Sequence, residues 1–299
     1  MQNLFRPVRI IPVQKESYRA KAVSLHALRL DEIHPIISGN KWFKLKAYLA
    51  DAAQQGKQTI LTFGGAYSNH ILATAALCAA SGFSSIGIIR GEKPNPLSPT
   101  LADAAQYGMH FHFISREAYR LKQIPEEAYG LLKKLDVYVI NEGGYGDKGR
   151  EGSMDILKSC DTENYTHIIA AVGTGTMLSG LVCAALPTQE IIGISVLKKA
   201  FSVAAEIQNL LPPQTRPFTL LHDFHFGGYA KHTPLLLQFM NDWFTETCIP
   251  TDFVYTAKTF YAADALINAG YFKKGSRVLV VQSGGLQGNR SLPAGALQF

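Results

Sequence analysis

A lysine at the start of a predicted helix is the first candidate for covalent chemistry in this chain. Lys41 follows Ser38-Gly-Asn40, and the apolar residues after it recur at helical spacing. Asn40 is a favourable N-cap, so we expect Lys41 in the first helical turn, where the helix dipole disfavours its charge. The nearby cations Lys44 and Lys46 act in the same direction and favour the neutral amine, the form that attacks an aldehyde. The spacing alone is also typical of a solvated helix face.

A glycine loop between a strand and a helix is the second candidate site. The predicted buried strand His167–Val172 runs into Gly173-Thr-Gly-Thr176 and then into an apolar helix. Unpaired N–H groups and the dipole at such a helix start favour a bound phosphate. The loop lacks the lysine of a P-loop, and Leu178 stands where the dinucleotide fingerprint has its third glycine. The pattern therefore favours a phosphate monoester, with a purely structural tight turn as the alternative.

Three further glycine-containing loops follow predicted strands. Phe63-Gly-Gly-Ala-Tyr-Ser-Asn-His70 opens an apolar helix, where Ser68 could serve as an N-cap or could help to hold a carboxylate. Asn141-Glu-Gly-Gly-Tyr145 and Ser283-Gly-Gly285 follow two other strands. Ligands of open α/β sheets collect at the carboxyl ends of the strands. These loops, together with the glycine loop and Lys41, therefore predict one shared site.

Strand patterns alternate with helix patterns from residue 57 onward, which indicates parallel sheets flanked by helices. The predicted strands are Thr59–Phe63, Ser85–Ile89, His110–Ile114, Val137–Ile140, His167–Val172, Ile191–Val196 and Arg277–Gln282. The predicted helices lie near Asn69–Ala80, Pro99–Tyr107, Gly149–Ser159, Met177–Ala185, Val203–Leu210, Pro234–Phe244 and Thr259–Ala269. A length of 299 residues favours two lobes, and the loop Asn141–Gly149, with four glycines in nine residues, is the best boundary.

Composition limits the kinds of partner that we expect. The chain has 47% hydrophobic residues and a net charge of +6, without the dense Lys/Arg stripe of a nucleic-acid-binding protein. It has neither a signal-peptide core nor a run of about 18 apolar residues, and its four cysteines form no CxxC pair. We therefore expect a soluble cytoplasmic protein with a small anionic ligand. His222 and His225 lack a third ligand at recognisable spacing, so we assign no metal.

Taken together, six motifs in order resemble the 1-aminocyclopropane-1-carboxylate deaminase and D-cysteine desulfhydrase family of pyridoxal-phosphate enzymes. They are Ser38-Gly-Asn-Lys41, Gly64-Gly-Ala-Tyr-Ser-Asn-His70, Glu142-Gly-Gly144, Gly173-Thr-Gly-Thr176, Val254-Tyr-Thr-Ala-Lys258 and Ser283-Gly-Gly285. Each motif is weak alone, whereas the ordered set is specific. The resemblance implies a two-lobed α/β fold of the tryptophan synthase β-subunit type (fold type II). Residues 1–50 plus 142–299 would form a large cofactor-binding domain, and residues 51–141 a small domain.

The resemblance also implies roles for individual residues. Lys41 would carry pyridoxal 5'-phosphate as a Schiff base and move the substrate's α-proton. Ser68, Tyr255 and Tyr229 would act beside Lys41, and Ser68, Asn69 and His70 would meet the substrate carboxylate. Asn69 would hydrogen-bond the ring oxygen of the cofactor. The phosphate would be bound by the backbone of Gly173, Thr174, Gly175 and Thr176. Thr256 and Ser283 are the two hydroxyl candidates for the contact with the pyridine nitrogen.

The substrate prediction rests on one departure from the family pattern. Cyclopropane-opening deaminases of this family carry Glu directly after the tyrosine that matches Tyr255, whereas this chain has Thr256. That favours a D-cysteine desulfhydrase, which yields pyruvate, sulfide and ammonia, over a 1-aminocyclopropane-1-carboxylate deaminase, which yields 2-oxobutyrate and ammonia. A non-catalytic protein that binds a phosphate ligand is the alternative from another class. By resemblance we expect a homodimer that acts on a small amino acid, and the composition predicts no nucleic-acid or membrane partner.

Overall fold

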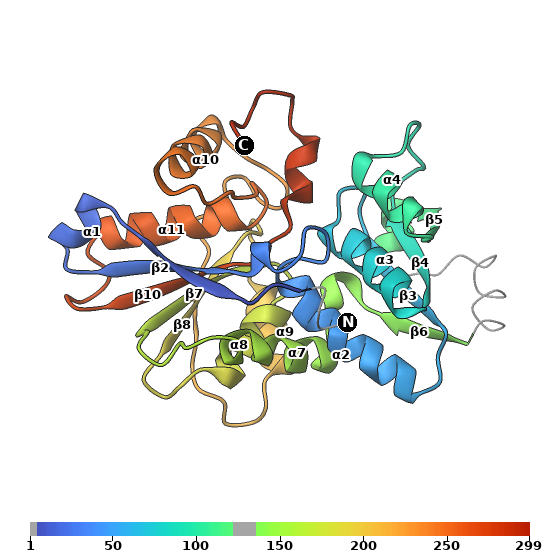
Figure 1. Cartoon of the computed structure of the whole chain (residues 1–299), viewed down its shortest axis with the longest axis horizontal. Coiled ribbons are helices and arrows are strands. Elements are labelled where there is room, and N and C mark those ends of the chain that lie inside the picture. Colours follow the sequence, from blue (N-terminus) through green and yellow to red (C-terminus); the bar gives the residue numbers. More distant parts are fainter. Residues whose placement is uncertain (1–4, 122–135) are drawn as a thin grey trace.

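In the part of the chain that the structure describes, the strands form two β-sheets, one with six strands and one with four (Figure 1). The structure, a computed structural model, describes residues 5–121 and 136–299. The larger sheet has the order β1-β2-β10-β7-β8-β9, and the smaller has the order β5-β4-β3-β6. The strands span Arg9–Val13 (β1), Ser24–Arg29 (β2), Thr59–Gly64 (β3), Ser84–Arg90 (β4), His110–Ile114 (β5), Val137–Ile140 (β6), His167–Val172 (β7), Glu190–Ser195 (β8), Thr219–Leu221 (β9) and Arg277–Gln282 (β10).

Neighbouring strands run parallel in both sheets, except that β1 is antiparallel to β2. In the centre of the larger sheet, β10 and β7 are buried along almost their whole length, as expected for parallel strands covered on both faces. The predicted α/β class is therefore confirmed. Sequence reasoning missed β1, β2 and β9. Pro12 interrupts the strand pattern of β1. The strand can contain a proline because it lies at the edge of the sheet, where some N–H positions are unpaired. The strand β9 is only three residues long.

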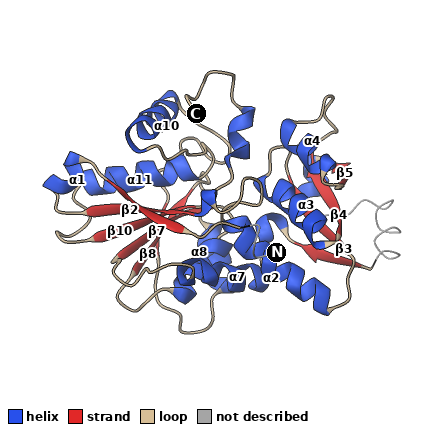
Figure 2. Cartoon of the chain, in the orientation of Figure 1, coloured by secondary structure: helices blue, strands red, loops and turns tan. Residues whose placement is uncertain are grey.

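Helices cover both faces of the larger sheet (Figure 2). One face packs against α1 (Glu16–Ala20), α10 (Pro234–Thr247) and α11 (Thr256–Asn268), which contribute Tyr18, Trp243 and Phe260 to a buried cluster. The other face packs against α7 (Asp147–Lys158), α8 (Thr176–Ala184) and α9 (Ser202–Leu210). The apolar strand residues are thus removed from water on both sides, which is the main stabilisation of the sheet.

The smaller sheet is likewise enclosed by helices. One cluster joins it to α2 (Asn40–Gln54) and α3 (Asn69–Ser81), another joins α3 to α4 (Pro99–Gln106), and a third contains Tyr119 of α5 (Arg116–Arg120). Short 3₁₀ turns occupy Leu30–Glu32 (η2), Glu142–Gly144 (η3) and Leu286–Ser291 (η4). The strands of this sheet fall within residues 51–141, and those of the larger sheet fall outside it. We retain the two predicted domains as a proposal, with α2 extending past residue 50 to Gln54.

Close helix packing ties α2 to the helix that follows the glycine loop. A Cβ on Gly152 of α7 would lie 2.0 Å from the carbonyl oxygen of Phe43 in α2. On the other side of α7, a Cβ on Gly180 of α8 would lie 2.4 Å from the Cβ of Ser153. Both glycines are therefore required for backbone contact between these helices. The consequence is a closely packed three-helix layer that carries two of the predicted site segments.

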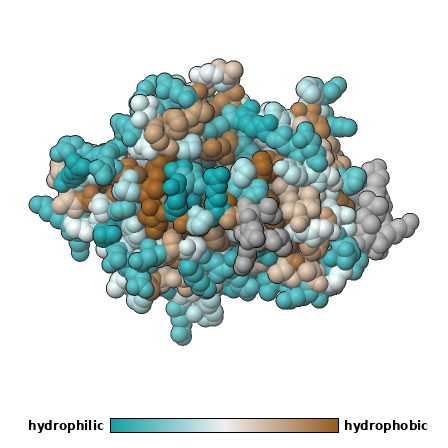
Figure 3. Space-filling model, viewed as in Figure 1, coloured by the Kyte–Doolittle hydropathy of each residue, from teal (hydrophilic) through white to brown (hydrophobic). Residues whose placement is uncertain are grey.

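The surface is mixed in character. On the face drawn in Figure 3, apolar and hydrophilic residues are interspersed among the coloured atoms. Within residues 5–121 and 136–299, every helix is too short or too polar to cross a lipid bilayer.

Candidate active site

Lys41 lies in the first turn of α2, held by a contact between the helix start and the end of β10. The N-cap of α2 is Gly39, not the predicted Asn40. Gly39 has φ +67°, and a Cβ there would lie 1.8 Å from the carbonyl oxygen of Ser283, so only glycine permits this approach. The same carbonyl accepts the N–H of Asn40 at 3.0 Å. The helix consequently begins one residue early, and the Asn40 side chain accepts a hydrogen bond from Lys41 Nζ at 3.2 Å.

Burial makes the amine of Lys41 easier to deprotonate. It lowers the pKa of Lys41 to about 8, while the carboxylate of Asp252 acts in the opposite direction. Lys44 is only 3% exposed, and burial, followed by the charge of Lys41, holds its pKa well below the usual range. The alternative of a solvated lysine face is therefore wrong for Lys44. The predicted contribution of Lys46 is also wrong, because Lys46 pairs with Asp155 at 2.7 Å.

The glycine loop has the geometry of an anion site. The first backbone hydrogen bond of α8 runs from the N–H of Ser179 to the carbonyl of Gly175 at 2.9 Å, so the N–H groups of the first turn have no partner within the helix. Gly175 is the N-cap, with φ +79°, and a Cβ there would meet Ile207 at 2.4 Å. The hydroxyls of Thr174 and Thr176 lie 3.1 Å apart. Thr176 is fully buried.

Ser68, Asn69 and His70 begin α3 from the opposite side of the site. Ser68 is the N-cap, because its Oγ accepts the N–H of Ile71 at 3.3 Å, and its own hydroxyl hydrogen remains available for a ligand. Asn69 donates one Nδ2 hydrogen to the carbonyl of Gly285 at 2.7 Å. This bond joins α3 to the loop after β10, and it leaves the second Nδ2 hydrogen of Asn69 for another acceptor.

A neighbouring threonine determines the tautomer of His70. The hydroxyl of Thr62 donates to the carbonyl of Ile140 at 2.8 Å, and the same oxygen lies 2.8 Å from His70 Nε2. Because a hydroxyl has one hydrogen, Thr62 must accept from Nε2–H, and Nδ1 keeps a lone pair. Burial, with the charges of Lys41 and Lys44, holds the pKa of His70 well below its usual range. His70 is thus a neutral side chain whose buried Nδ1 has no partner among the described residues.

Tyr255 and Tyr229 form one aromatic wall. Their ring centroids are 6.0 Å apart, with an interplanar angle of 69°. Burial raises the pKa of both hydroxyls, and it raises that of Tyr255 more strongly. The second cause of the raised pKa of Tyr255 is the neighbouring hydroxyl of Tyr229. Both tyrosines therefore stay protonated at neutral pH and can donate hydrogen bonds or protons.

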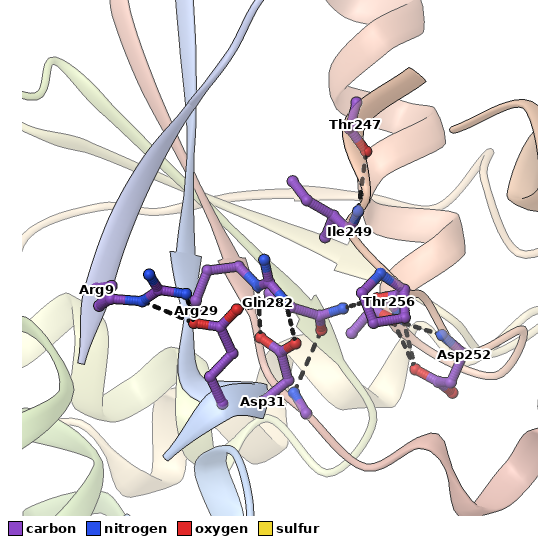
Figure 4. A network of polar contacts seen from close by, with 11 residues as sticks. Arg9, Arg29, Asp31, Thr247, Ile249, Asp252, Thr256 and Gln282 are labelled. Carbon is purple, nitrogen blue, oxygen red and sulfur yellow. Dashed lines mark hydrogen bonds and ion pairs between the residues drawn. The ribbon is translucent and has the colours of Figure 1, made fainter. Parts of the chain in front are cut away.

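Asp252 orders the turn that presents Tyr255. Its carboxylate accepts the N–H groups of Val254, Tyr255 and Thr256 at 2.9–3.0 Å, and also the hydroxyl of Thr256 at 2.9 Å. The oxygen of that hydroxyl in turn accepts the N–H of Asp252 at 2.8 Å. Figure 4 shows Thr256 turned toward Asp252. The single hydroxyl hydrogen of Thr256 is therefore committed to Asp252 and is not offered to a cavity.

Ser283 is presented by its neighbour Gln282. Gln282 is fully buried, its amide donates to the carbonyl of Pro250, and its Oε1 accepts the N–H of Gly284 at 3.3 Å (Figure 4). These bonds hold the backbone on both sides of Ser283. Of the two hydroxyl candidates for a pyridine nitrogen, Ser283 is the one that lines a cavity.

Two adjoining cavities bring most of the predicted residues together. The inner one has a volume of about 60 Å³ and the outer one of about 370 Å³. Both are lined by Lys41, Asn69, Gly173, Thr174 and Tyr255. Gly175 and Ser283 line only the inner cavity, and Ser68, His70 and Tyr229 only the outer one. Thr176 and Thr256 line neither.

Comparison with known proteins decides the family. The model of the family described as "Pyridoxal-phosphate dependent enzyme" matches residues 6–284. The chain belongs to this family of pyridoxal-phosphate-dependent enzymes. The resemblance inferred from the motifs is confirmed, and the alternative of a non-catalytic phosphate-binding protein is set aside.

Individual relatives of this pyridoxal-phosphate enzyme carry two activities in their names. The chain is 27% identical to the "Bifunctional D-cysteine desulfhydrase/1-aminocyclopropane-1-carboxylate deaminase, mitochondrial" of Arabidopsis thaliana, over 84% of this chain and 70% of the relative. It is 25% identical to the D-cysteine desulfhydrase of Klebsiella pneumoniae, over 86% of each chain. The crystal structure of an ACC (1-aminocyclopropane-1-carboxylate) deaminase homologue superposes with a TM-score of 0.83 at 25% identity, covering 96% of this chain and 91% of the other. The enzyme is thus a lyase or deaminase of this type.

The residues of the inner cavity fit pyridoxal phosphate. Gly175 provides a helix start with N–H groups that lack partners within the helix, and the buried amine of Lys44 lines the same cavity as a further hydrogen-bond donor. Lys41 presents an amine for the aldehyde, and Asn69 retains a free Nδ2 hydrogen for the ring oxygen. The Ser283 hydroxyl would hold the pyridine nitrogen.

Sequence reasoning missed several groups at this site. Lys44 was noticed only as a charge near Lys41, and Asp252 was not noticed at all. An aspartate whose carboxylate can accept the N–H groups two to four residues ahead is a turn signal that could have identified Asp252 in the turn before α11. Arg90 and Glu142 also line the outer cavity. No local pattern marks Arg90, because it comes from the end of a different strand, β4.

Proposed function

We propose that this enzyme is a D-cysteine desulfhydrase, which converts D-cysteine and water to pyruvate, hydrogen sulfide and ammonia. The observation that carries the proposal is Thr256, which follows Tyr255 where cyclopropane-opening members of the family carry Glu. The outer cavity of about 370 Å³ suits a small amino acid next to Lys41. The Klebsiella relative named as a D-cysteine desulfhydrase supports the same substrate.

The chain's own groups can be assigned to the steps of this elimination. Pyridoxal phosphate, when bound, supplies an aldehyde that condenses with amines and a ring that takes up the electron pair of the α-carbon. Lys41 holds the cofactor and, once released by the substrate, accepts the α-proton with its neutral amine. Ser68 lines the region proposed for the substrate carboxylate and can donate its hydroxyl hydrogen there, whereas His70, whose Nε2–H is held by Thr62, offers only the lone pair of Nδ1. Tyr255, which stays protonated at neutral pH, supplies a proton to the departing thiolate, and Tyr229 lies against its ring at the outer cavity.

A second candidate is the opening of 1-aminocyclopropane-1-carboxylate, which with water gives 2-oxobutyrate and ammonia. It is favoured by the Arabidopsis relative, whose name carries both activities, and by the likeness to the ACC deaminase homologue. Both reactions require loss of a proton or cleavage of a bond at the α-carbon beside Lys41. They differ in the second bond that breaks, the Cβ–S bond of D-cysteine, which releases sulfide, or a Cα–Cβ bond of the ring, which keeps all its carbons in 2-oxobutyrate, so the products separate them.

The test is a direct assay of the purified holoenzyme with D-cysteine, L-cysteine and 1-aminocyclopropane-1-carboxylate, measuring keto acid and sulfide. We expect sulfide and pyruvate from D-cysteine, and background values from the Lys41→Ala variant. Release of 2-oxobutyrate with a higher kcat/KM than pyruvate would reverse the order of the two candidates. Failure of borohydride to fix the cofactor on Lys41 would overturn the assignment of Lys41.

We also propose a homodimer in the cytoplasm. The dimer is carried over from the family resemblance. The location is supported by the four cysteines, which are all unpaired in the structure, as is usual in a reducing compartment. Sedimentation of the holoenzyme and fractionation of the native host test these two points.

A further inference from the structure

Lys258 is a buried cation that the proposed chemistry does not use. It lies on α11, three residues after Tyr255, and its side chain is 0% exposed. Burial lowers its pKa to about 8, whereas Asp252 raises it. Nζ donates a hydrogen bond of 2.7 Å to the carbonyl of Gly228. Burial of an ammonium group is costly, and an apolar side chain of similar length would fill the same volume without that cost.

The segment on which Lys258 acts has an unusual backbone. Phe226, Gly227, Gly228 and Ala230 all have positive φ, at +47°, +94°, +115° and +50°. Left-handed conformations at the non-glycine residues Phe226 and Ala230 cost free energy and persist only where surrounding contacts enforce them. Such strain is typical of functional sites. Lys258 supplies one of the contacts that enforce this conformation.

The strained segment, residues 226–230, carries Tyr229. It is attached to α11 at two points, the hydrogen bond from Lys258 to Gly228 and the ring contact of Phe226 with Tyr261, whose centroids are 4.8 Å apart. Tyr229 is 44% exposed, yet it lines the outer cavity and meets Tyr255 edge to face. The Tyr229 ring can stay against Tyr255 only if the backbone of residues 226–230 keeps its conformation.

We propose that Lys258 is a positioning residue that holds residues 226–230 in their strained conformation, so that Tyr229 stays against Tyr255 at the outer cavity and contributes to substrate binding. The inference rests on the proposed function only in assigning the outer cavity to a small amino acid. The hydrogen bond, the strained backbone and the cavity wall are independent of which amino acid is used.

The test compares Lys258→Met with wild type in two measurements on the holoenzyme. Amide hydrogen exchange of residues 226–231 reports the loop directly and needs no substrate. We expect exchange in this segment to become about tenfold faster or more in Lys258→Met, while the cofactor content is unchanged. With any substrate that wild type turns over, KM should rise about tenfold, with kcat within about threefold. Lys274→Met, which removes an exposed lysine, is the matched control.

A double-mutant cycle then asks whether Lys258 acts through Tyr229. In the Tyr229→Ala background, Lys258→Met should add less than about twofold to KM, because the side chain that it positions is already missing. Equal increases in both backgrounds would show a role unrelated to Tyr229 and overturn the proposal. Unchanged hydrogen exchange in residues 226–231 would also overturn the proposal. Because this measurement needs no substrate, it can refute the role of Lys258 whether or not the proposed function is correct.

A second variant guards against misfolding. If Lys258→Met does not fold, Lys258→Gln carries the test, because its amide keeps a neutral donor on a shorter side chain. We expect its exchange in residues 226–231 to be faster than wild type. Wild-type exchange together with a wild-type KM in that variant would contradict the inference.

Discussion

The pKa of Lys41 predicts how the loading of cofactor onto the apoenzyme depends on pH. Only the neutral amine attacks the aldehyde, so the initial rate should rise tenfold per pH unit below the pKa and become level above it. Burial lowers this pKa to about 8 from 10.5. At pH 7 the neutral fraction is therefore about 10%, compared with about 0.03% for an ordinary lysine, an advantage of roughly 300-fold.

Asp252 and Asp155 provide a matched pair of perturbations. Asp252 favours the charged form of Lys41, so Asp252→Asn should lower the pKa further and move the break in the profile below that of wild type. Asp155 pairs with Lys46, not Lys41, and Asp155→Asn should leave the break in place. A shift in the first variant and none in the second would assign the effect to the charge of Asp252.

The assay mixes apoenzyme with pyridoxal phosphate, quenches with borohydride at short times and measures the modified Lys41 peptide by mass spectrometry. A free lysine derivative treated in parallel corrects for ionisation of the cofactor itself. A rate that continues to rise to about pH 10, as the reference pKa of lysine predicts, would refute the argument that burial activates Lys41. Modification at Lys44 instead would show that the wrong amine has been assigned.

Three further substitutions test the scaffold of the site. Gly39→Ala would place a Cβ 1.8 Å from a backbone oxygen at a positive φ, and we expect thermal unfolding to show a loss of several kcal/mol, about 3 or more, and little cofactor uptake. Gly175→Ala, at φ +79°, should weaken binding of pyridoxal phosphate about tenfold or more in a fluorescence titration, and unchanged affinity would argue against the glycine loop as the phosphate site. Thr62→Val removes the acceptor of His70 Nε2–H and should cost about 1–3 kcal/mol of stability, with a changed His70 tautomer signal by ¹⁵N NMR. An unaltered signal would contradict the tautomer derived for His70.

Much of the fold could be predicted from the chain because its signals are local. Seven strands of the parallel sheets are apolar or β-branched runs bounded by turns, and the structure reproduces them within one or two residues. Two of the missed strands give a weaker signal, because Pro12 interrupts β1 and β9 is only three residues long. The position of Lys41 in the first turn of α2 was predictable as well, since the apolar helix pattern begins there.

The contacts of individual site residues were less predictable. Asn40 has a good N-cap composition, but a carbonyl from Ser283 occupies the helix start, so Gly39 became the cap. Thr256 and Ser283 were equal candidates for the pyridine nitrogen until Asp252 was found to hold the hydroxyl of Thr256. Each outcome depends on a partner that no local pattern specifies.

The sequence by itself determined which residue types are available, the order of the motifs and the parallel α/β class, because these follow from composition, hydrophobic period and short-range turn chemistry. Tertiary structure decided which groups are chemically active. Burial, which depends on the whole fold, lowered the pKa values of Lys41 and Lys258, and a bond from Asn69 to Gly285 joined segments 216 residues apart. The free energy of an ionised or hydrogen-bonded group is a property of its surroundings, and those surroundings exist only once the chain has folded.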